Sequence, residues 1–371
     1  MHTPYPRTVA VAVSGGVDSL AALLLLREAG CRVLALHGLF LPDGPDAPPD
    51  GLDEACASLG APLHVANLRD VFRREVLTPF AAAYAAGRTP NPCALCNRAV
   101  KFGALLDAAR ALGADALATG HYARLAPGPE GPDAAPLLAA AADSAKDQSY
   151  FLSLVPRERL RRAFFPLYGR SKDESRALVA DAGLSAPLPL ESQDICFAPP
   201  DAAPGRPAAD AYRPFLERHW RALGVTPPGP GPVLLREADG SLREIARHRG
   251  LWRYTEGQRK GLGIAHSEPL FALAKDCAAN TLIVGPRALL GMTFCVTGPA
   301  NIFLPPEFWP ARLLARLRHR QRPAPARAAL ENGRLRITLD EPQFPTAPGQ
   351  IAALYDMEGR VLAAGEVESM A

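Results

Sequence analysis

A glycine-rich turn between an apolar strand and a Leu/Ala-rich helix constrains this sequence more than any other feature. Val9–Val13 is an unbroken apolar run, and Ser14-Gly-Gly-Val-Asp-Ser19 follows it directly, ahead of the helical stretch Leu20–Ala29. Gly15 and Gly16 let backbone amides approach an anion, while the helix start adds unpaired N–H groups and the positive end of the helix dipole. The turn therefore predicts a phosphate site at the end of the first strand.

The side chains of this turn narrow the kind of phosphate chemistry. Ser14 and Ser19 supply hydroxyl groups, and Asp18 is a candidate ligand for Mg²⁺. The Walker A pattern, with its Lys before Ser or Thr, is absent, so transfer of a γ-phosphate is not indicated. The simpler alternative is a glycine turn that caps a helix and binds nothing.

The first half of the chain alternates strand-like and helical segments. Ser171 and Glu174 have the spacing of a capping box, and Gly183 closes the last helix. This rhythm predicts an α/β domain whose parallel sheet is covered by helices on both faces. The expected strands are Thr8–Val13, Arg32–Phe40, Leu63–Leu68 and Ala116–Thr119, and the expected helices are Leu20–Ala29, Leu52–Leu59, Val71–Ala86, Arg98–Leu112 and Lys172–Ala182.

After about residue 200 the segments become short, alternating and bounded by turns. Ala202–Ala209 and Thr226–Pro232 are rich in Pro and Gly and indicate linkers. The later runs predict two small β domains or barrels, so we expect three domains, over residues 1–200, 201–285 and 286–371. The strand-like runs are Leu282–Val284, Thr293–Thr297, Leu313–Arg322, Leu335–Leu339 and Ile351–Tyr355.

Composition excludes several classes of protein. With 371 residues, 48% of them hydrophobic, and a net charge of +3, the chain fits a soluble globular protein of two or three domains. No apolar run approaches the roughly 18 residues of a membrane span, and the amino terminus lacks a signal peptide, so we expect a cytoplasmic protein without membrane association. Seven cysteines, an odd number, favour a reducing compartment over a disulfide scaffold.

Two cysteine-containing loops point to sulfur chemistry. Cys93 and Cys96 lie in the proline-stiffened segment Gly87–Phe102, just before a helix expected to begin near Asn97. Because a helix amino terminus lowers the pKa of a thiol, Cys96 is expected to be a thiolate. Cys196 lies in a second polar loop. Two reactive thiols on separate loops of the domain that carries the phosphate turn predict sulfur transfer through a persulfide and a transient disulfide.

Other interpretations of these cysteines stay open. Cys93 and Cys96 could be buried thiols or half of a zinc site, although a lone C-x-x-C is a weak zinc signal. Cys196 taken alone could be a core residue. All three could instead hold an iron–sulfur cluster with one open iron site.

Seven motifs together resemble those of the tRNA-specific 2-thiouridylases, a family of PP-loop ATP pyrophosphatases. The resemblance implies cleavage of ATP between its α and β phosphates, adenylation of the C2 oxygen of a wobble uridine, and its replacement by sulfur. It also implies ATP and Mg²⁺ as cofactors, tRNA of the Lys, Glu and Gln type as substrate, and a cysteine desulfurase or relay protein as sulfur donor. The motifs are Ser14–Ser19, Gly87–Phe102, Ala118–Arg124, Lys146–Leu152, Ser192–Phe197, Tyr254–Ile264 and Ala347–Gln350, and they span nearly the whole chain.

The resemblance further implies roles for individual residues. Cys96 would be the catalytic nucleophile, Cys196 would carry the persulfide, and the barrel expected over 286–371 would contact tRNA. ATP would be bound by Ser14, Gly15, Gly16, Val17, Asp18, Ser19, Gly38 and Gly120. The target base and tRNA would be contacted by Asn91, Pro92, Cys93, His121, Lys146, Asp147, Gln148, Arg318, His319 and Gln350.

The sequence departs from the family pattern at some of these positions. Cys93 replaces a common Asp, which leaves the acid/base group open, and Arg318-His319 replaces an Arg-Tyr pair, which removes a stacking contact. Arginines at alternate positions of Arg316–Arg322 would share one face of a strand and suit phosphate contacts. Ordinary solvated surface charge is the alternative.

Two other functions are compatible with the sequence. An amide-forming PP-loop ligase would also adenylate its substrate, but it would keep its activity when Cys96 and Cys196 are replaced. A non-catalytic tRNA-binding protein on the same fold would bind tRNA without releasing pyrophosphate.

Overall fold

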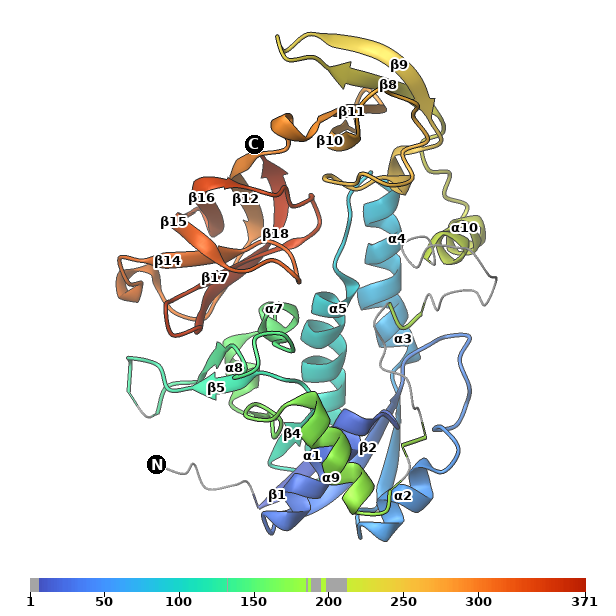
Figure 1. The fold of residues 1–371 in the computed structure, drawn as a ribbon. Coiled ribbons are helices and arrows are strands. Elements are labelled where there is room, and N and C mark those ends of the chain that lie inside the picture. The colour runs from blue at the N-terminus through green and yellow to red at the C-terminus, as the bar shows by residue number, and fades with distance from the viewer. Residues whose placement is uncertain (1–6, 132, 185, 188–194, 198–211) are drawn as a thin grey trace.

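The computed structural model describes residues 7–131, 133–184, 186–187, 195–197 and 212–371. It contains a helix-covered parallel sheet, a four-stranded sheet and a closed barrel (Figure 1). The fold class predicted from the sequence, an α/β domain followed by two small β domains, is confirmed. The domain boundaries near 200 and 285 stay a prediction, and the expected linker Ala202–Ala209 lies outside the described residues.

The first body is a five-stranded parallel sheet in the order β3-β2-β1-β4-β7. Since β2 and β4 lie on opposite sides of β1, the chain changes direction of winding there. In open α/β sheets, ligands bind at this switch point, outside the carboxyl ends of the strands. The strands are β1 (Thr8–Ala12), β2 (Arg32–Leu39), β3 (Leu63–Asn67), β4 (Ala116–Ala118) and β7 (Ala163–Phe164).

Helices cover both faces of this sheet because side chains alternate along β1. Val9 and Val11 pack with α1 (Val17–Glu28), α2 (Leu52–Ser58) and α9 (Lys172–Asp181). Ala10 packs on the other face, in a core with two long helical segments. The first comprises α3 (Arg69–Phe72), η1 (Arg73–Leu77) and α4 (Thr78–Ala85), and the second α5 (Pro92–Leu95), η2 (Cys96–Leu105) and α6 (Leu106–Ala111).

The expected start of the second helical segment is wrong by about one turn. The helix begins at Pro92 rather than near Asn97, and the Asn91 side chain caps it by accepting a hydrogen bond of 3.1 Å from the Ala94 amide. Pro at the first helical position and Asn at the cap are favoured for this role. Cys96 therefore lies in the second turn of the helix. By contrast, the capping box expected of Ser171 and Glu174 is confirmed.

Shorter elements complete this body. They are the hairpin of β5 (Arg124–Ala126) and β6 (Leu137–Ala139), and the helices α7 (Ser149–Leu152), α8 (Arg157–Leu160) and α10 (Tyr212–Leu223). The sequence analysis missed α10, which docks on α4 through a 3.0 Å hydrogen bond from the Trp220 indole to the Ala81 carbonyl oxygen. None of the helices in the described part of the chain is long and apolar enough to cross a bilayer.

The second body is a four-stranded sheet in the order β10-β11-β8-β9, with a small core of its own. The strands β11 and β8 pair in parallel, and the outer pairs are antiparallel. The strands are β8 (Gly231–Arg236), β9 (Leu242–His248), β10 (Leu270–Asp276) and β11 (Thr281–Pro286), with the turn η4 (Leu251–Arg253) between β9 and β10.

The third body is a six-stranded barrel that closes because β12 pairs with both β16 and β18. Its order is β12-β16-β15-β14-β17-β18, and the short β13 (Asn301–Ile302) pairs with β18. The strands are β12 (Met292–Pro299), β14 (Leu313–Arg316), β15 (Ala324–Glu331), β16 (Arg334–Gln343), β17 (Ile351–Tyr355) and β18 (Val361–Met370); the turns η5 (Arg287–Leu289) and η6 (Pro306–Phe308) complete it.

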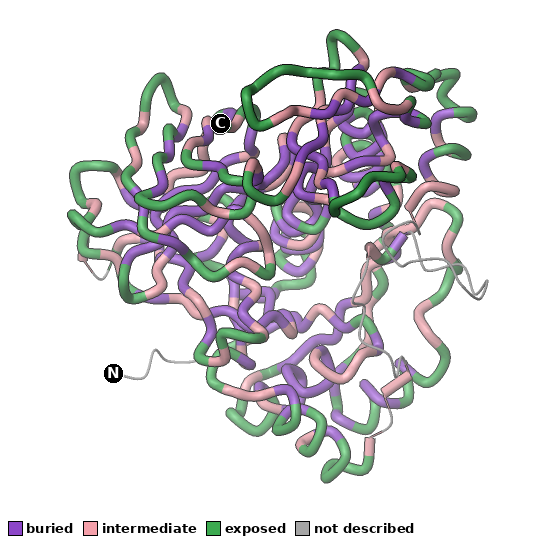
Figure 2. Tube along the Cα trace, turned by 45° about the horizontal axis from the view of Figure 1, so that its top comes forward, coloured by how far each residue is buried: buried purple, intermediate pink, exposed green. Residues whose placement is uncertain are grey.

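One hydrophobic core joins the barrel to the first body. It runs from Phe80 and Val100 in the helices to Leu335 and Ile351 in the barrel strands. Buried segments fill the interior of both parts, and exposed segments form their outer loops (Figure 2). The barrel is therefore packed directly against the α/β domain.

Candidate active site

The glycine-rich turn adopts a conformation that leaves a helix start open. Gly15 has a φ of 89°, which favours glycine, and Gly16 is the N-cap of α1 without a side-chain capping bond. The Ser19 hydroxyl donates to the Gly16 carbonyl oxygen over 2.8 Å and accepts from the Ser14 amide over 3.2 Å. The serines thus brace the turn, and the start of α1 lies at the switch point without a side-chain cap, which leaves its first amides available to an anion.

A pocket of about 460 Å³ lies at this turn. It collects Ser14, Asp18 and Ser19 from the turn with residues from five other segments. Those that the sequence analysis named are Gly38, Gly120, His121, Gln148 and Cys196. The pocket therefore joins the predicted nucleotide turn to one of the two predicted reactive cysteines.

Gly120 allows the loop after β4 to touch the start of α1. A Cβ atom at this position would lie 2.8 Å from the carbonyl carbon and oxygen of Asp18, both backbone atoms that cannot yield easily. At Gly38 a Cβ atom would instead meet the Phe40 ring, 2.3 Å from its Cε1 atom. Glycine is thus required at position 120 for the pocket to keep its shape.

The Asp18 carboxylate is held by two partners. The Tyr122 hydroxyl lies 2.8 Å from Oδ1, and the Lys172 ammonium donates to Oδ2 over 2.6 Å. Asp18 is the sole carboxylate among the described residues that line the pocket, and no cluster of three His, Cys, Asp or Glu suited to a metal ion occurs in the described part. The residues therefore do not form a protein-held Mg²⁺ cage.

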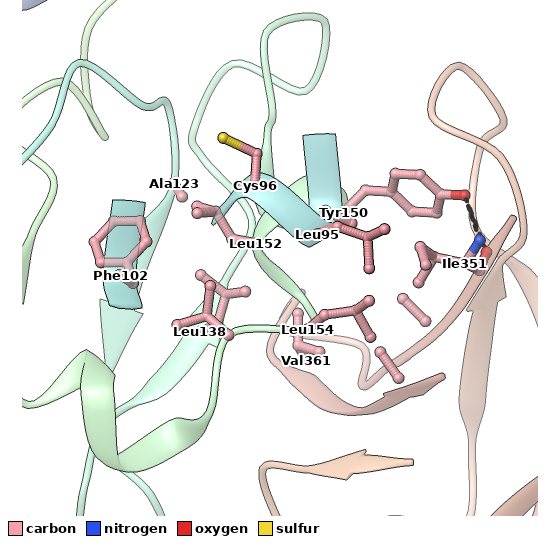
Figure 3. Packing of buried hydrophobic residues seen from close by; sticks show 14 of the residues in the cluster. Leu95, Cys96, Phe102, Ala123, Leu138, Tyr150, Leu152, Leu154, Ile351 and Val361 are labelled. Atoms are coloured by element: carbon pink, nitrogen blue, oxygen red, sulfur yellow. Dashed lines mark hydrogen bonds between the residues drawn. The ribbon is translucent and has the colours of Figure 1, made fainter. Parts of the chain in front are cut away.

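Cys96 is buried, which overturns the expectation that it is a thiolate in this state. Burial raises the pKa of the Cys96 thiol to about 12, against a smaller lowering by Lys101. The helix starts one turn earlier than expected, and the effect of the dipole fades within the first turn. Cys96 belongs to the hydrophobic cluster, and Figure 3 shows it at the edge of the drawn side chains, with its sulfur directed away from Leu152 and Leu154.

Cys93 and Cys196 are both exposed, unlike Cys96. Cys196 lines the pocket, whereas Cys93 does not. The protein around each thiol nonetheless raises its pKa by desolvation, and Lys101 opposes the rise at both. The three thiols interact electrostatically, but they do not form a metal-ligating group among the described residues, so the iron–sulfur alternative is not supported.

Lys101 is a site residue that the sequence analysis did not identify. It projects from η2 into the pocket wall, with its Nζ atom 3.4 Å from Nε2 of His121. The Nδ1 atom of His121 lies 2.7 Å from the Thr119 hydroxyl. Burial, and then the charge of Lys101, hold the pKa of His121 well below its usual value, so the imidazole is neutral. The scarcity of lysine, at five residues in the chain, was the available signal.

The Lys146-Asp-Gln motif divides between two environments. Gln148 lines the pocket and accepts a 3.0 Å hydrogen bond from the Tyr122 amide. Lys146 lies in the preceding loop, outside the residues that line the pocket.

Asp147, which the sequence analysis expects to contact tRNA, is buried in this structure. Its side chain is 4% exposed and lies 2.5 Å from the Arg316 guanidinium. Its Oδ1 atom accepts hydrogen bonds of 3.1 Å from the amides of Ala141 and Ser149. The carboxylate is therefore fully engaged inside the protein.

The arginine-rich segment is not a strand with one basic face, so that expectation is also wrong. The strand β14 ends at Arg316, which turns inward to Asp147, and a turn follows. Arg318 donates to the Glu256 carbonyl oxygen over 2.6 Å, and the His319 ring lies 4.3 Å from the ring of Phe151. In this structure Arg318 and His319 therefore pack on protein groups.

Gln350 fastens the barrel to the cysteine segment. Its side-chain amide donates to the Thr89 carbonyl oxygen over 2.8 Å, and the Thr89 amide donates to the Pro348 carbonyl oxygen over 2.7 Å. Gly349, at a φ of 96°, lies so close that a Cβ atom would be 2.9 Å from the Thr89 backbone. The segment that leads to Asn91, Pro92 and the two cysteines is thus held from the barrel.

A second contact between the barrel and the first body lies beside this one. The Tyr150 hydroxyl donates to the Ile351 carbonyl oxygen over 3.0 Å, as Figure 3 shows. Tyr150 belongs to α7, directly after the Lys146-Asp-Gln motif. The cysteine segment and the segment after the Lys146-Asp-Gln motif are therefore tied to the barrel at adjacent positions, Gln350 and Ile351.

Three sequence families match successive parts of the chain. They are described as a tRNA methyl transferase HUP domain over residues 7–200, a tRNA methyl transferase PRC-barrel domain over residues 228–286, and an aminomethyltransferase β-barrel domain over residues 298–367. A solved 4-thiouridine synthetase–RNA complex with bound ATP is similar at 17% identity and a TM-score of 0.34, covering 59% of this chain and 51% of that chain, which is too weak a likeness to carry an argument.

Curated relatives match over almost their whole length. The chain is 48% identical to the tRNA-specific 2-thiouridylase MnmA of Nitratidesulfovibrio vulgaris, covering 97% of this chain and 98% of the relative. It is 47% identical to the protein of the same name from Oleidesulfovibrio alaskensis, over 98% and 99%, and 40% identical to that of Moorella thermoacetica, over 97% and 99%. At this identity and coverage, the chain belongs to the tRNA-specific 2-thiouridylase family.

Proposed function

We propose that this protein carries out the ATP-dependent 2-thiolation of a wobble uridine in tRNA. The observation that carries the proposal is the single pocket in which the glycine-rich turn, Gly120 and Cys196 converge. A nucleotide turn alone would suit any adenylating ligase. An exposed cysteine in the same pocket suits a reaction that passes sulfur to the activated atom.

The first step activates the base. The C2 oxygen of uridine attacks the α-phosphorus of ATP, a P–O bond forms, and the bond to pyrophosphate breaks. The amides at the start of α1, with the hydroxyls of Ser14 and Ser19, are suited to hold the phosphates. Because Asp18 is already paired with Lys172, Mg²⁺ would be held mainly by the phosphates of ATP, where it would offset the negative charge of the pyrophosphate.

The second step replaces oxygen with sulfur. A persulfide on Cys196, loaded by a desulfurase or relay protein, attacks C2 with its terminal sulfur, and AMP departs with the oxygen. The Cys96 thiolate then attacks the Cys196 sulfur. The bond between that sulfur and the transferred one breaks, its electron pair stays on the 2-thiouridine, and a Cys96–Cys196 disulfide forms. An external dithiol reduces the disulfide before the next turnover.

Cys96 is ready for this role only after its surroundings change. With a pKa of about 12 it is almost fully protonated at neutral pH. The proposal therefore places formation of the Cys96 thiolate after tRNA and ATP have bound. Exposed Cys196 is accessible to a donor beforehand.

The test is 2-thiouridine formation, followed on a mercury-affinity gel with ATP, Mg²⁺, a persulfide source and unmodified tRNA of the Lys, Glu or Gln type. The wild-type protein and a Cys277→Ser control, at an exposed cysteine outside the active-site pocket, are expected to shift the tRNA. Cys96→Ser and Cys196→Ser are expected to abolish the shift. Pyrophosphate release by the wild type and by both variants, without a gel shift in any of them, would indicate an amide-forming ligase. Binding of tRNA without pyrophosphate release would indicate a non-catalytic protein.

A further inference from the structure

Lys101 is the one Lys or Arg among the described residues that line the active-site pocket. No carboxylate lies within ion-pair distance of its ammonium group in the described part of the chain. Three other buried or partly buried cations are paired with carboxylates. Lys172 pairs with Asp18 over 2.6 Å, Lys275 with Glu256 over 3.4 Å and Arg316 with Asp147 over 2.5 Å.

The contact that Lys101 makes fixes its position without cancelling its charge. Its ammonium donates to Nε2 of His121, so the ring proton of this neutral imidazole lies on Nδ1, which donates to the Thr119 hydroxyl oxygen. His121 is 9% exposed, and burial holds its pKa well below the usual value. Among the described residues nothing compensates this positioned cation, and such an arrangement is costly unless an anion binds beside it.

The location of Lys101 indicates which anion would bind beside its ammonium group. The pocket that it lines is also lined by Ser14 and Ser19 of the nucleotide turn and by Cys196. Its charge also acts on the thiols of Cys93 and Cys96. The atoms between a nucleotide in the turn and a base facing the cysteines are the α-phosphate and the oxygen that it activates.

We infer that Lys101 is a catalytic residue whose ammonium group contacts the α-phosphate while it is transferred to the base and while it leaves as AMP. His121 is the positioning residue that aims the ammonium. The inference rests on the proposed function, because it takes the adenylated uridine as the bound species. A fixed cation at this point stabilises the negative charge that develops on the phosphate oxygens in both steps.

The test compares three variants: Lys101→Met, Lys101→Arg and the matched control Lys260→Met, at an exposed lysine with no described side-chain partner. The first readout is single-turnover pyrophosphate release with ATP, Mg²⁺ and unmodified tRNA, without a sulfur donor. Melting temperature, ATP affinity and tRNA affinity are measured on the same preparations. We expect Lys101→Met to slow pyrophosphate release by about 100-fold or more, as for loss of one charge-stabilising donor.

The control and wild-type proteins are expected to be alike, and Lys101→Arg is expected to recover part of the rate because it keeps the charge. Affinities and melting temperature should stay within twofold and a few degrees of wild type. Wild-type pyrophosphate release by Lys101→Met would overturn the inference, as would equal loss in both Lys101 variants with a lower melting temperature. If the wild-type protein itself released no pyrophosphate, the proposed function would fail instead.

Discussion

At the scale of single residues, Gly120 is the position where one methyl group has the largest expected effect on the pocket. The Cβ atom of Gly120→Ala would lie 2.8 Å from the Asp18 backbone, so the start of α1 has to move. Overpacking of this kind costs about 1–3 kcal/mol. We expect weaker ATP binding, measured by calorimetry. Gly169→Ala, where no atom lies within 4 Å of the added Cβ, is the control and should bind ATP normally; equal affinities would contradict this account.

A second prediction for single residues concerns the contribution of the buried Asp147–Arg316 ion pair to stability. Asp147→Asn keeps the shape but leaves a buried guanidinium without its counter-charge, which costs about 3–5 kcal/mol. The free energy of unfolding, measured in urea, should fall by that amount. Asp173→Asn removes an exposed pair with Arg176 and is expected to change stability by about 0.5 kcal/mol or less. Similar losses of unfolding free energy in both variants would show that the buried pair stabilises the protein no more than the exposed pair does.

The raised pKa of Cys96 gives a prediction for pH dependence. A thiol reacts with iodoacetamide as the thiolate, so a pKa of about 12 means slow alkylation at pH 8 that keeps rising through pH 10. Exposed Cys196 and Cys93 should react first at every pH in this range. Peptide mass spectrometry at each pH resolves the three rates. Rapid alkylation of Cys96 at pH 7 in the free protein would refute its burial.

At the scale of elements, the contact between the barrel loop and the cysteine segment is expected to matter more for activity than for stability. Gln350→Ala removes the hydrogen bond to the Thr89 carbonyl oxygen, two residues before the cap of α5. A neutral hydrogen bond contributes about 1 kcal/mol, so the protein should stay folded. We expect the rate of thiolation to fall several-fold, while tRNA affinity, measured by filter binding, changes little. A large loss of affinity with a normal rate would instead support the direct tRNA contact expected from the sequence.

The elements also show what a sequence can and cannot specify. Strand and helix positions in the first half follow local rules: β2 and α2 end within one residue of expectation, and the Ser171–Glu174 capping box forms. Asn91-Pro92 is a readable signal for the start of α5, although the sequence analysis predicts this helix one turn later. No sequence signal marks the end of β14, because Arg316 turns there toward a carboxylate 169 residues away. A local sequence pattern does not predict pairing across such a distance.

The candidate site likewise has features that the sequence predicts and features that it does not. The glycine-rich turn, Gly120 and Cys196 meet in one pocket as parallel-sheet topology suggests. The burial of Cys96 and Asp147 could not be predicted, since it depends on how α7 and the barrel pack over them. The role of Lys101 could not be predicted from the sequence either, because it depends on the distance between η2 and the loop after β4.

At the scale of the whole molecule, stability is expected to be uneven. The sheet over Gly231–Pro286 has a small core of its own, whereas the α/β domain and barrel share a large one. Within this sheet β9 is an outer strand that pairs with β8 and exposes most of its residues. Amides of β9 should therefore exchange with deuterium earlier than those of β1 and β17. Equal protection in hydrogen-exchange mass spectrometry would contradict this prediction.

The shared core has a consequence for how this architecture can be re-engineered. Because Ile351 and Leu335 of the barrel pack in the same cluster as Phe80 and Val100, the barrel is not an independent module that can be exchanged. Transplanting a barrel from another RNA-binding protein would expose that cluster on both pieces and loosen the segment that carries the cysteines. Substrate preference is more safely redesigned through surface loops than by exchange of the barrel.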